Sequence, residues 1–250
     1  MSLAGHDIAI VLLHGYLGFL PDAYWSRFAA IHRAFERRGC AVHRVRQPAT
    51  ADLGVRAENL ASRLRALPHD RLVLVGHSMG GLDARLAAHA GDPERRIAQV
   101  LTIGTPHRGT AAAEWLLERS CLEGTVARWL DRGGLENLLP PRMAAFNAAV
   151  PDRADVGYRA VAGWRAPQRL SPPWCRIARH LRRCEGDNDG VVSVASAAWG
   201  SHLLEVEADH LQLVGMRPLS GADVHGRLPR HFVRLRRLLE HMLADADARR

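Results

Sequence analysis

The segment LVLVGHSMGGLDARL, residues 72–86, places a serine between two glycines where an apolar run gives way to a helical pattern. The apolar residues Leu72–Val75 are typical of a strand that is buried on both faces, and the residues after Ser78 continue as a helix. A direct passage from strand to helix needs a sharp bend, and Gly76 and Gly80 have no side chains that would collide there. The segment therefore predicts a tight strand–turn–helix unit with Ser78 at its tip.

The rest of the chain alternates strands and helices in the same way. Short apolar runs predict strands, and longer runs with apolar residues at helical spacing predict helices. Because parallel strands are joined by crossover helices, the alternation predicts an α/β fold with a mostly parallel, six-stranded sheet and helices on both faces. The predicted strands are Ile8–Leu13, Ala41–Val45, Leu72–Val75, Ile97–Ile103, Tyr158–Ala162 and His202–Val206, and the predicted helices are Asp22–Arg38, Val55–Leu67, Met79–His89 and Arg230–Leu243.

The alternation breaks between residues 110 and 156. This stretch is rich in leucine and tryptophan, contains arginines, and is interrupted by Pro140 and Pro141. We expect two or three short helices here, inserted as a cap into a single domain that spans residues 1–250. The cap either covers the sheet or also forms a lid over an acyl pocket, because ligands of open α/β sheets bind at the adjoining edge.

Composition narrows the classes of partner. The 250 residues include 34 basic side chains, all of them arginine, and the formal net charge is +8. The arginines are dispersed and no nucleic-acid-binding motif is recognisable, so we expect no nucleic acid as a partner. A transient contact with an anionic membrane or lipid interface is compatible with this charge, although a solvated basic face is the simpler interpretation.

The first apolar run gives little support for export. Ile8–Leu13 is short and no basic region precedes it, so we expect a cytoplasmic protein, with a secreted protein whose signal has been removed as the alternative. No apolar run approaches the ~20 residues that span a bilayer. The four cysteines lack zinc-type spacing. Free thiols are expected at Cys175 and Cys184 in a reducing compartment, and a disulfide between them is the alternative after export.

A serine in such a turn has a chemical use. Gly-x-Ser-x-Gly between a strand and a helix exposes the serine hydroxyl as a nucleophile, and the N–H of Met79 at the helix start can stabilise an oxyanion. His14, Gly15 and Tyr16 form a tight loop after the first strand, and the Tyr16 N–H is the second candidate oxyanion donor. We expect His14 to brace this loop rather than to act as a base.

An acid and a base follow the serine in the order that such a site requires. Asp189 lies in the turn of NDGVVSV just after the fifth predicted strand, and Asp187 is the alternative acid. His210, in ADHLQLVG after the sixth strand, is the candidate base. His202 lies at the wrong end of that strand, and His225 lies in a polar loop beyond it.

The motifs HGYLGF, VGHSMGGLDAR, TIGTPHRGT, NDGVVSV and ADHLQLVG follow one another between residues 8 and 214. In this order they resemble those of α/β-hydrolase lipases and esterases, closest to the bacterial triacylglycerol lipases. The resemblance implies a catalytic triad of Ser78, Asp189 and His210, with Tyr16 and Met79 as oxyanion donors. It also implies hydrolysis of a small acyl ester or a lipid through an acyl-enzyme, with no cofactor. By the same resemblance the strand before His14 corresponds to the third strand of the fold, and we expect the two strands that usually precede it to be absent.

Two features differ from the secreted members of that group, which carry export signals and often bind calcium. Their calcium is held by an aspartate two residues after the catalytic histidine, and Gln212 stands at this position, so we expect no metal.

The alternatives to an ester hydrolase are a thioesterase or amidase on the same fold, or a non-catalytic module that binds a lipid or a partner. We predict that the substrate contacts are Leu17, His77, Trp115 and Leu116.

Overall fold

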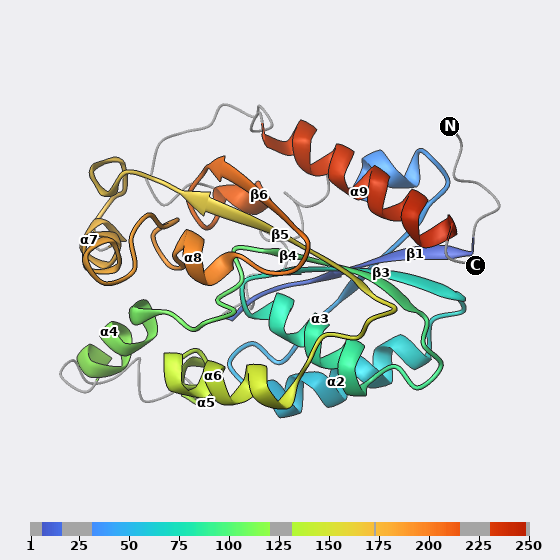
Figure 1. Cartoon of the computed structure of the whole chain (residues 1–250), viewed down its shortest axis with the longest axis horizontal. Coiled ribbons are helices and arrows are strands. Elements are labelled where there is room, and N and C mark those ends of the chain that lie inside the picture. The colour runs from blue at the N-terminus through green and yellow to red at the C-terminus, as the bar shows by residue number, and fades with distance from the viewer. Residues whose placement is uncertain (1–6, 17–31, 121–131, 173, 216–230, 249–250) are drawn as a thin grey trace.

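The computed structural model of the protein describes residues 7–16, 32–120, 132–172, 174–215 and 231–248 (Figure 1). Within these ranges six parallel strands form one sheet in the order β2-β1-β3-β4-β5-β6. The predicted α/β fold and its six strands are therefore confirmed, and every described strand pair is parallel. The strands are β1 (Ile8–Leu13), β2 (Ala41–Val45), β3 (Arg71–His77), β4 (Ile97–Ile103), β5 (Gly157–Trp164) and β6 (His202–Glu207).

Helices cover both faces of the sheet because successive strand residues point to opposite sides. In β1, Ile10 and Leu12 pack towards α9 (His231–Ala248), and Val11 and Leu13 pack towards the opposite layer. That second layer contains α2 (Leu53–Arg65) and α3 (Met79–Ala90). Figure 1 shows α9 above the sheet and α2 and α3 below it. Among the described residues, no helix has the length and the apolar character needed to cross a bilayer.

Several predicted boundaries shift for local reasons. The helix α2 begins at Leu53 rather than Val55, because the Asp52 side chain accepts a hydrogen bond from the Val55 N–H at 3.0 Å and caps the helix. The last helix extends to residue 248, and β3 continues through residue 77. Of the helix predicted over residues 22–38, only residues 32–36 lie within the described helical part, and Gly39 follows with a positive φ of 80°.

A helix that the sequence had not led us to expect lies between the fifth and sixth strands. This helix, α7 (Trp174–Cys184), has apolar residues at helical spacing, which was the available signal: Trp174, Ile177, Ala178 and Leu181. Cys175 and Cys184 lie nine positions apart on it, a rise of about 13 Å, so they are too far apart for a disulfide. Both are free thiols. The alternative of a disulfide between them is therefore excluded.

The described part of residues 110–156 contains three helices, α4 (Ala111–Ser120), α5 (Gly133–Glu136) and α6 (Pro140–Ala149). A buried arginine of α3 fixes α6 in place. Arg85 donates from Nη1 to Asn147 Oδ1 at 2.8 Å, and its guanidinium lies 3.8 Å from the centre of the Trp199 ring. Asn147 in turn donates to the His107 carbonyl at 2.7 Å. These hydrogen bonds attach α6 to the body of the domain. The function of the predicted cap as a lid stays a prediction.

The bend after β3 gives the first testable prediction. A Cβ added at Gly76 would lie 2.3 Å from the Gly80 carbonyl oxygen, so the backbone itself would have to move. We expect Gly76→Ala to lower the free energy of unfolding by about 3 kcal/mol or more. Gly54→Ala on the exposed face of α2 is the matched control, and it should stay within about 1 kcal/mol of the parent. Urea denaturation at equal m-values measures the free energy of unfolding of both variants. An equal loss of unfolding free energy in Gly76→Ala and Gly54→Ala would contradict this prediction.

Candidate active site

Ser78 forms the whole connection between β3, which ends at His77, and α3, which begins at Met79. Its backbone has φ 54° and ψ −130°, an unusual conformation for a residue with a side chain, and it costs on the order of 1–3 kcal/mol. The Ser78 N–H donates to the Ile103 carbonyl at the end of β4 at 2.8 Å, and Thr105 donates to the Ser78 carbonyl at 2.9 Å. The predicted strand–turn–helix unit is present, and the neighbouring strand holds it in its strained shape.

The loop after β1 lies against this serine. A Cβ on Gly15 would be 2.6 Å from Ser78 Cβ and 3.1 Å from Ser78 Oγ, so only a glycine allows the loop to approach this closely. Tyr16 follows directly, and its ring packs beside Gly134 of α5. Met79 is fully buried at the start of α3. Of the two residues predicted as oxyanion donors, Met79 follows Ser78 in the chain, and Tyr16 follows the glycine that lies against Ser78.

His14 braces this loop from within the protein, as predicted. Its Nδ1–H donates to the Gly15 carbonyl at 2.8 Å, and its Nε2 accepts from the Gln47 N–H at 3.0 Å. These two bonds require a neutral ring with the proton on Nδ1. Burial lowers the pKa of His14, and this favours the neutral form that the bonds need.

A buried ion pair that the sequence analysis missed ties the same loop to two helices. Arg56 of α2 donates to Asp83 of α3 from Nη2 at 2.6 Å and from Nε at 3.0 Å, and neither side chain is exposed. Arg56 also donates to the carbonyls of His14 at 2.9 Å and Pro48 at 2.8 Å. Burial raises the pKa of Asp83, and the charge of Arg56 acts in the opposite direction. The available sequence signal for this ion pair was Asp83, a carboxylate in a helix whose other residues are mostly small or apolar.

The structure brings the candidate acid and base together. His210 Nδ1 and Asp189 Oδ2 lie 2.7 Å apart, and both side chains are buried. Asp189 Oδ1 accepts from the backbone N–H groups of Val191 at 2.9 Å and Val192 at 2.7 Å, which fixes the carboxylate. Asp187 instead lies on the surface, where it pairs with Arg182.

The two other candidate histidines do not reach this pair. His202 is exposed at the start of β6, at the opposite end of the strand from His210. His225 lies outside the described residues. His210 is therefore the candidate base that the described structure places beside a buried carboxylate.

Neighbouring strand ends bring this pair to the edge of the sheet where the serine lies. A Cβ on Gly104, directly after β4, would be 3.1 Å from Asp189 Oδ2 and 3.2 Å from His210 Nδ1. The residue before it, Ile103, is the partner of the Ser78 N–H. Asp189 does not directly follow the fifth strand as expected, because α7 intervenes. Its turn returns to that strand end, where the backbone N–H of Arg165 donates to the Asn188 carbonyl at 2.8 Å.

Three of the predicted substrate contacts lie in the described structure, and Leu17 lies outside it. His77 is only 2% exposed, and its Nε2 lies 3.0 Å from the His210 carbonyl oxygen, so its ring packs against the loop of His210. Its role as a substrate contact stays a prediction. Trp115 is half-buried where α4 packs against α7, and Leu116 is exposed.

The loop that carries His210 is held by protein hydrogen bonds. Asp209 Oδ1 accepts from the N–H groups of Leu211 at 3.1 Å and Gln212 at 3.0 Å. Gln212 Oε1 accepts from the Asp209 N–H at 3.1 Å, so this neutral oxygen already has a donor. The residues here do not fit the calcium site of the related secreted enzymes. In the described part of the chain, no three histidine, cysteine, aspartate or glutamate side chains are grouped to hold a metal ion.

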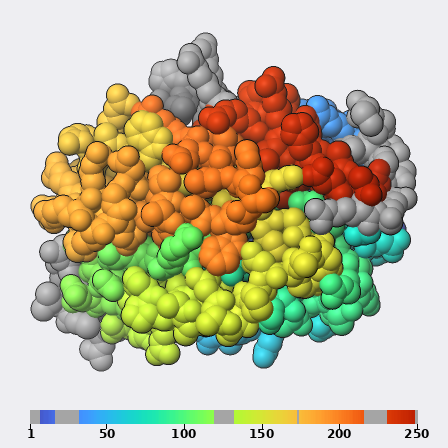
Figure 2. Space-filling view, in the orientation of Figure 1, coloured from blue at the N-terminus to red at the C-terminus, as the bar shows by residue number. Residues whose placement is uncertain are grey.

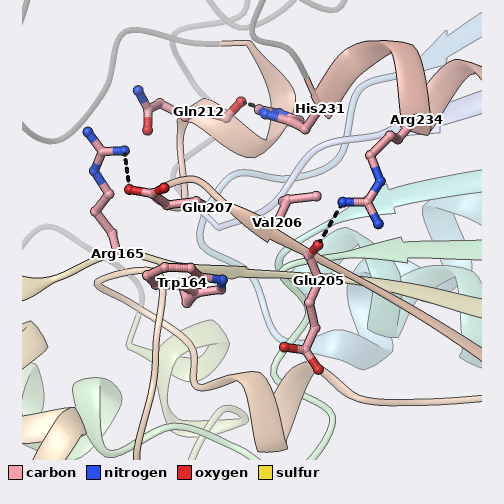
Figure 3. Close-up of a pocket in the computed structure, with 8 residues that line it drawn as sticks. All are labelled: Trp164, Arg165, Glu205, Val206, Glu207, Gln212, His231 and Arg234. Carbon is pink, nitrogen blue, oxygen red and sulfur yellow. Dashed lines mark hydrogen bonds and ion pairs between the residues drawn. The ribbon is translucent and has the colours of Figure 1, made fainter.

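A groove of about 490 Å³ lies behind this loop, between the ends of β5 and β6 and the start of α9 (Figure 3). His231 donates there to the Gln212 carbonyl at 3.1 Å, and Arg234 donates to the Glu205 carbonyl at 3.3 Å. Neither Ser78 nor His210 lines the groove, so it is distinct from the candidate active site. Its lining residues are Trp164, Arg165, Glu205, Val206, Glu207, Gln212, His231 and Arg234.

The model of the alpha/beta hydrolase family matches residues 10–244. The chain belongs to the alpha/beta hydrolase family. Its relatives include triacylglycerol lipase 2 of Saccharomyces cerevisiae, 26% identical over 81% of this chain and 65% of the yeast protein. A triacylglycerol lipase of Vibrio cholerae is 33% identical over 52% of this chain and 42% of its own length.

Solved structures show the same fold. The mature lipase BlEst2 of Bacillus licheniformis has a TM-score of 0.73 and 22% identity, over 92% of this chain and 91% of its own. The metagenomic carboxyl esterase MGS0156 has a TM-score of 0.71 and 24% identity, over 85% and 67% of the two chains. The chain spans less than two thirds of the length of the yeast and Vibrio cholerae lipases, so their activity does not transfer to it by similarity alone.

The buried ion pair gives the second prediction. Arg56→Met would leave the Asp83 carboxylate buried without its partner and remove the donor to the His14 carbonyl. We expect the free energy of unfolding to fall by about 3–5 kcal/mol, as for other broken buried pairs. Arg56→Met/Asp83→Leu removes both charges and should recover part of the loss in urea denaturation. A single variant within 1 kcal/mol of the parent would show that the pair does not hold the loop.

Proposed function

We propose that the protein is a serine carboxylic-ester hydrolase, an esterase or lipase, with Ser78 as nucleophile, His210 as base and Asp189 as orienting acid. The observation that carries this proposal is the 2.7 Å contact between His210 Nδ1 and Asp189 Oδ2. This contact lies beside the end of β4, where the Ile103 carbonyl accepts from the Ser78 N–H. The Asp189 carboxylate accepts a hydrogen bond from the Nδ1–H of His210. The other ring nitrogen of His210, Nε2, is therefore left to take a proton from a serine. The family membership and the strained turn at Ser78 support the same reaction.

The reaction follows from these roles. His210 takes the Ser78 proton as the hydroxyl oxygen attacks the ester carbonyl, and the N–H groups of Tyr16 and Met79 stabilise the oxyanion. His210 then protonates the departing alcohol, which leaves an acylated serine. Water, activated by the same ring, releases the acid and restores the enzyme. Each oxyanion donor contributes about 10²–10³ in rate in enzymes of this type.

We propose an acyl ester or lipid with an apolar acyl group as the substrate class. Helix α4 carries apolar side chains: Ala113 belongs to the same apolar cluster as Met79, Trp115 is half-buried against α7, and Leu116 is exposed. Two of the relatives that match in sequence are named triacylglycerol lipases, which agrees with such a substrate. A thioester or an amide is the alternative for the same triad, and paired oxygen-ester and thioester substrates would separate these activities.

The nucleophile gives the third prediction. Ser78→Ala should lower turnover of p-nitrophenyl esters on the order of 10⁶-fold and abolish labelling by a fluorophosphonate probe. Ser201→Ala, at an exposed serine at the edge of β6, is the matched control and should keep parental activity. Two outcomes would refute the proposed reaction. One is fluorophosphonate labelling of the Ser78→Ala variant equal to that of the parent, and the other is no turnover of p-nitrophenyl esters of any acyl chain length by the folded parent.

We further propose a transient contact with an anionic lipid surface through α7. Its apolar face packs inward, and Arg176, Arg179, Arg182 and Arg183 are exposed on the other side. Figure 2 shows α7 beside α4 at one end of the molecule, the end to which the strands of Figure 1 point. A basic face at this end would hold a lipid surface close to the carboxyl edge of the sheet.

This contact gives the fourth prediction. Each arginine near an anionic surface contributes about 1 kcal/mol, so Arg176→Glu/Arg179→Glu/Arg183→Glu should weaken binding to phosphatidylserine vesicles about 100-fold or more. The control is Arg63→Glu/Arg65→Glu/Arg237→Glu, with the same change in charge on α2 and α9. Flotation should show parental binding for this control. Equal loss in both triple variants would indicate attraction by net charge rather than by α7.

A further inference from the structure

We infer that His77, the residue before the nucleophile, positions the catalytic base by hydrogen bonding to the backbone of His210. This inference rests on the proposed function. His77 Nε2 lies 3.0 Å from the His210 carbonyl oxygen, and the centres of the two rings are 4.6 Å apart at an angle of 42°. The two residues are 133 positions apart in the chain, and the ring of His77 is almost fully buried.

The chemistry of this contact fixes the proton on His77. A carbonyl oxygen only accepts, so Nε2 must carry the hydrogen. Burial, reinforced by the neighbouring His210, holds the pKa of His77 well below its usual value, so the ring is neutral. A neutral ring with its single proton on Nε2 is a donor of fixed direction, and it adds no positive charge beside the ring of His210.

The geometry gives His77 a place that the other contacts of the base do not fill. The His210 N–H donates to the Asp189 carbonyl at 2.9 Å, and the His210 ring contacts the Asp189 carboxylate at 2.7 Å. Both of these bonds lead to the turn of the acid. The bond from His77 leads to β3, the strand that carries Ser78, and so connects the base to the nucleophile.

The connection matters because the rate of proton transfer from Ser78 to His210 is sensitive to small changes in the distance between them. A displacement of about 1 Å between reacting groups can cost about 10²-fold in rate. His77 is the last residue of β3 and Ser78 follows it directly, so the ring of His77 has a fixed place relative to the serine backbone. His77 therefore acts as a positioning residue, through the backbone of His210 and without touching substrate.

The test compares two amides that differ in reach. In His77→Gln the side-chain NH₂ lies close to the place of Nε2 and can donate to the His210 carbonyl, whereas in His77→Asn it is one bond too short. We expect kcat of p-nitrophenyl ester hydrolysis to fall about 100-fold in His77→Asn and less than 10-fold in His77→Gln, with KM within threefold of the parent in both. Fluorophosphonate labelling of Ser78 should slow in the same order.

A second measurement does not depend on turnover. The proton between His210 and Asp189 should give a low-field ¹H resonance in the parent and in His77→Gln, and this resonance should broaden or vanish in His77→Asn. Equal kcat and equal resonances in the two folded variants would overturn the inference. A parent that neither hydrolyses esters nor labels would refute the proposed function, and the resonances would still decide whether His77 holds the base.

A buried histidine elsewhere controls for general damage. His107 is fully buried and its Nε2 lies 3.0 Å from Thr102 Oγ1, away from the base. His107→Asn and His107→Gln should not reproduce the difference in kcat between the two amides at position 77. If they do, the effect at His77 comes from loss of packing and the positioning role is wrong.

Discussion

The close approach of backbone segments around Ser78 is the constraint on which the rest of the site depends. A Cβ at Gly76 would lie 2.3 Å from the Gly80 carbonyl, one at Gly80 would lie 2.7 Å from the His14 carbonyl, and one at Gly15 would lie 2.6 Å from Ser78 Cβ. Strand, helix and loop therefore meet at distances that no side chain permits. This contact allows a strained serine to stand directly against the loop after β1.

Buried polar side chains then fix the segments that the glycines bring together. His14 holds the loop, the pair Arg56–Asp83 joins that loop to α2 and α3, and His77 reaches the loop of His210. Each of these groups hydrogen-bonds to a backbone carbonyl or amide, so each one sets the position of the main chain. A buried ion pair adds little net stability, because desolvation offsets much of its attraction. Its consequence here is a defined position for the loop over the serine.

The sequence predicted the strands and the chemistry of the motifs well, because both depend on local patterns. Apolar runs gave six strands, and the order of serine, aspartate and histidine gave the pair that the structure brings together. The pattern did not separate Asp189 from Asp187 on chemical grounds. The fold separates them, since Asp189 is buried against the end of β5 and Asp187 pairs with Arg182 at the surface. It also did not reveal α7, although the apolar spacing of that helix was readable.

The sequence by itself determined that strands and helices alternate, that a serine sits in a glycine-flanked turn, and that an aspartate and a histidine follow it. These features are local, because propensity, periodicity and turn sterics act over a few residues. Only the tertiary structure decided the partners of Arg56 and His77, which lie 27 and 133 positions away from them along the chain. Such contacts depend on how the sheet edge brings distant segments together. That arrangement places the ring of His77 against the backbone of His210.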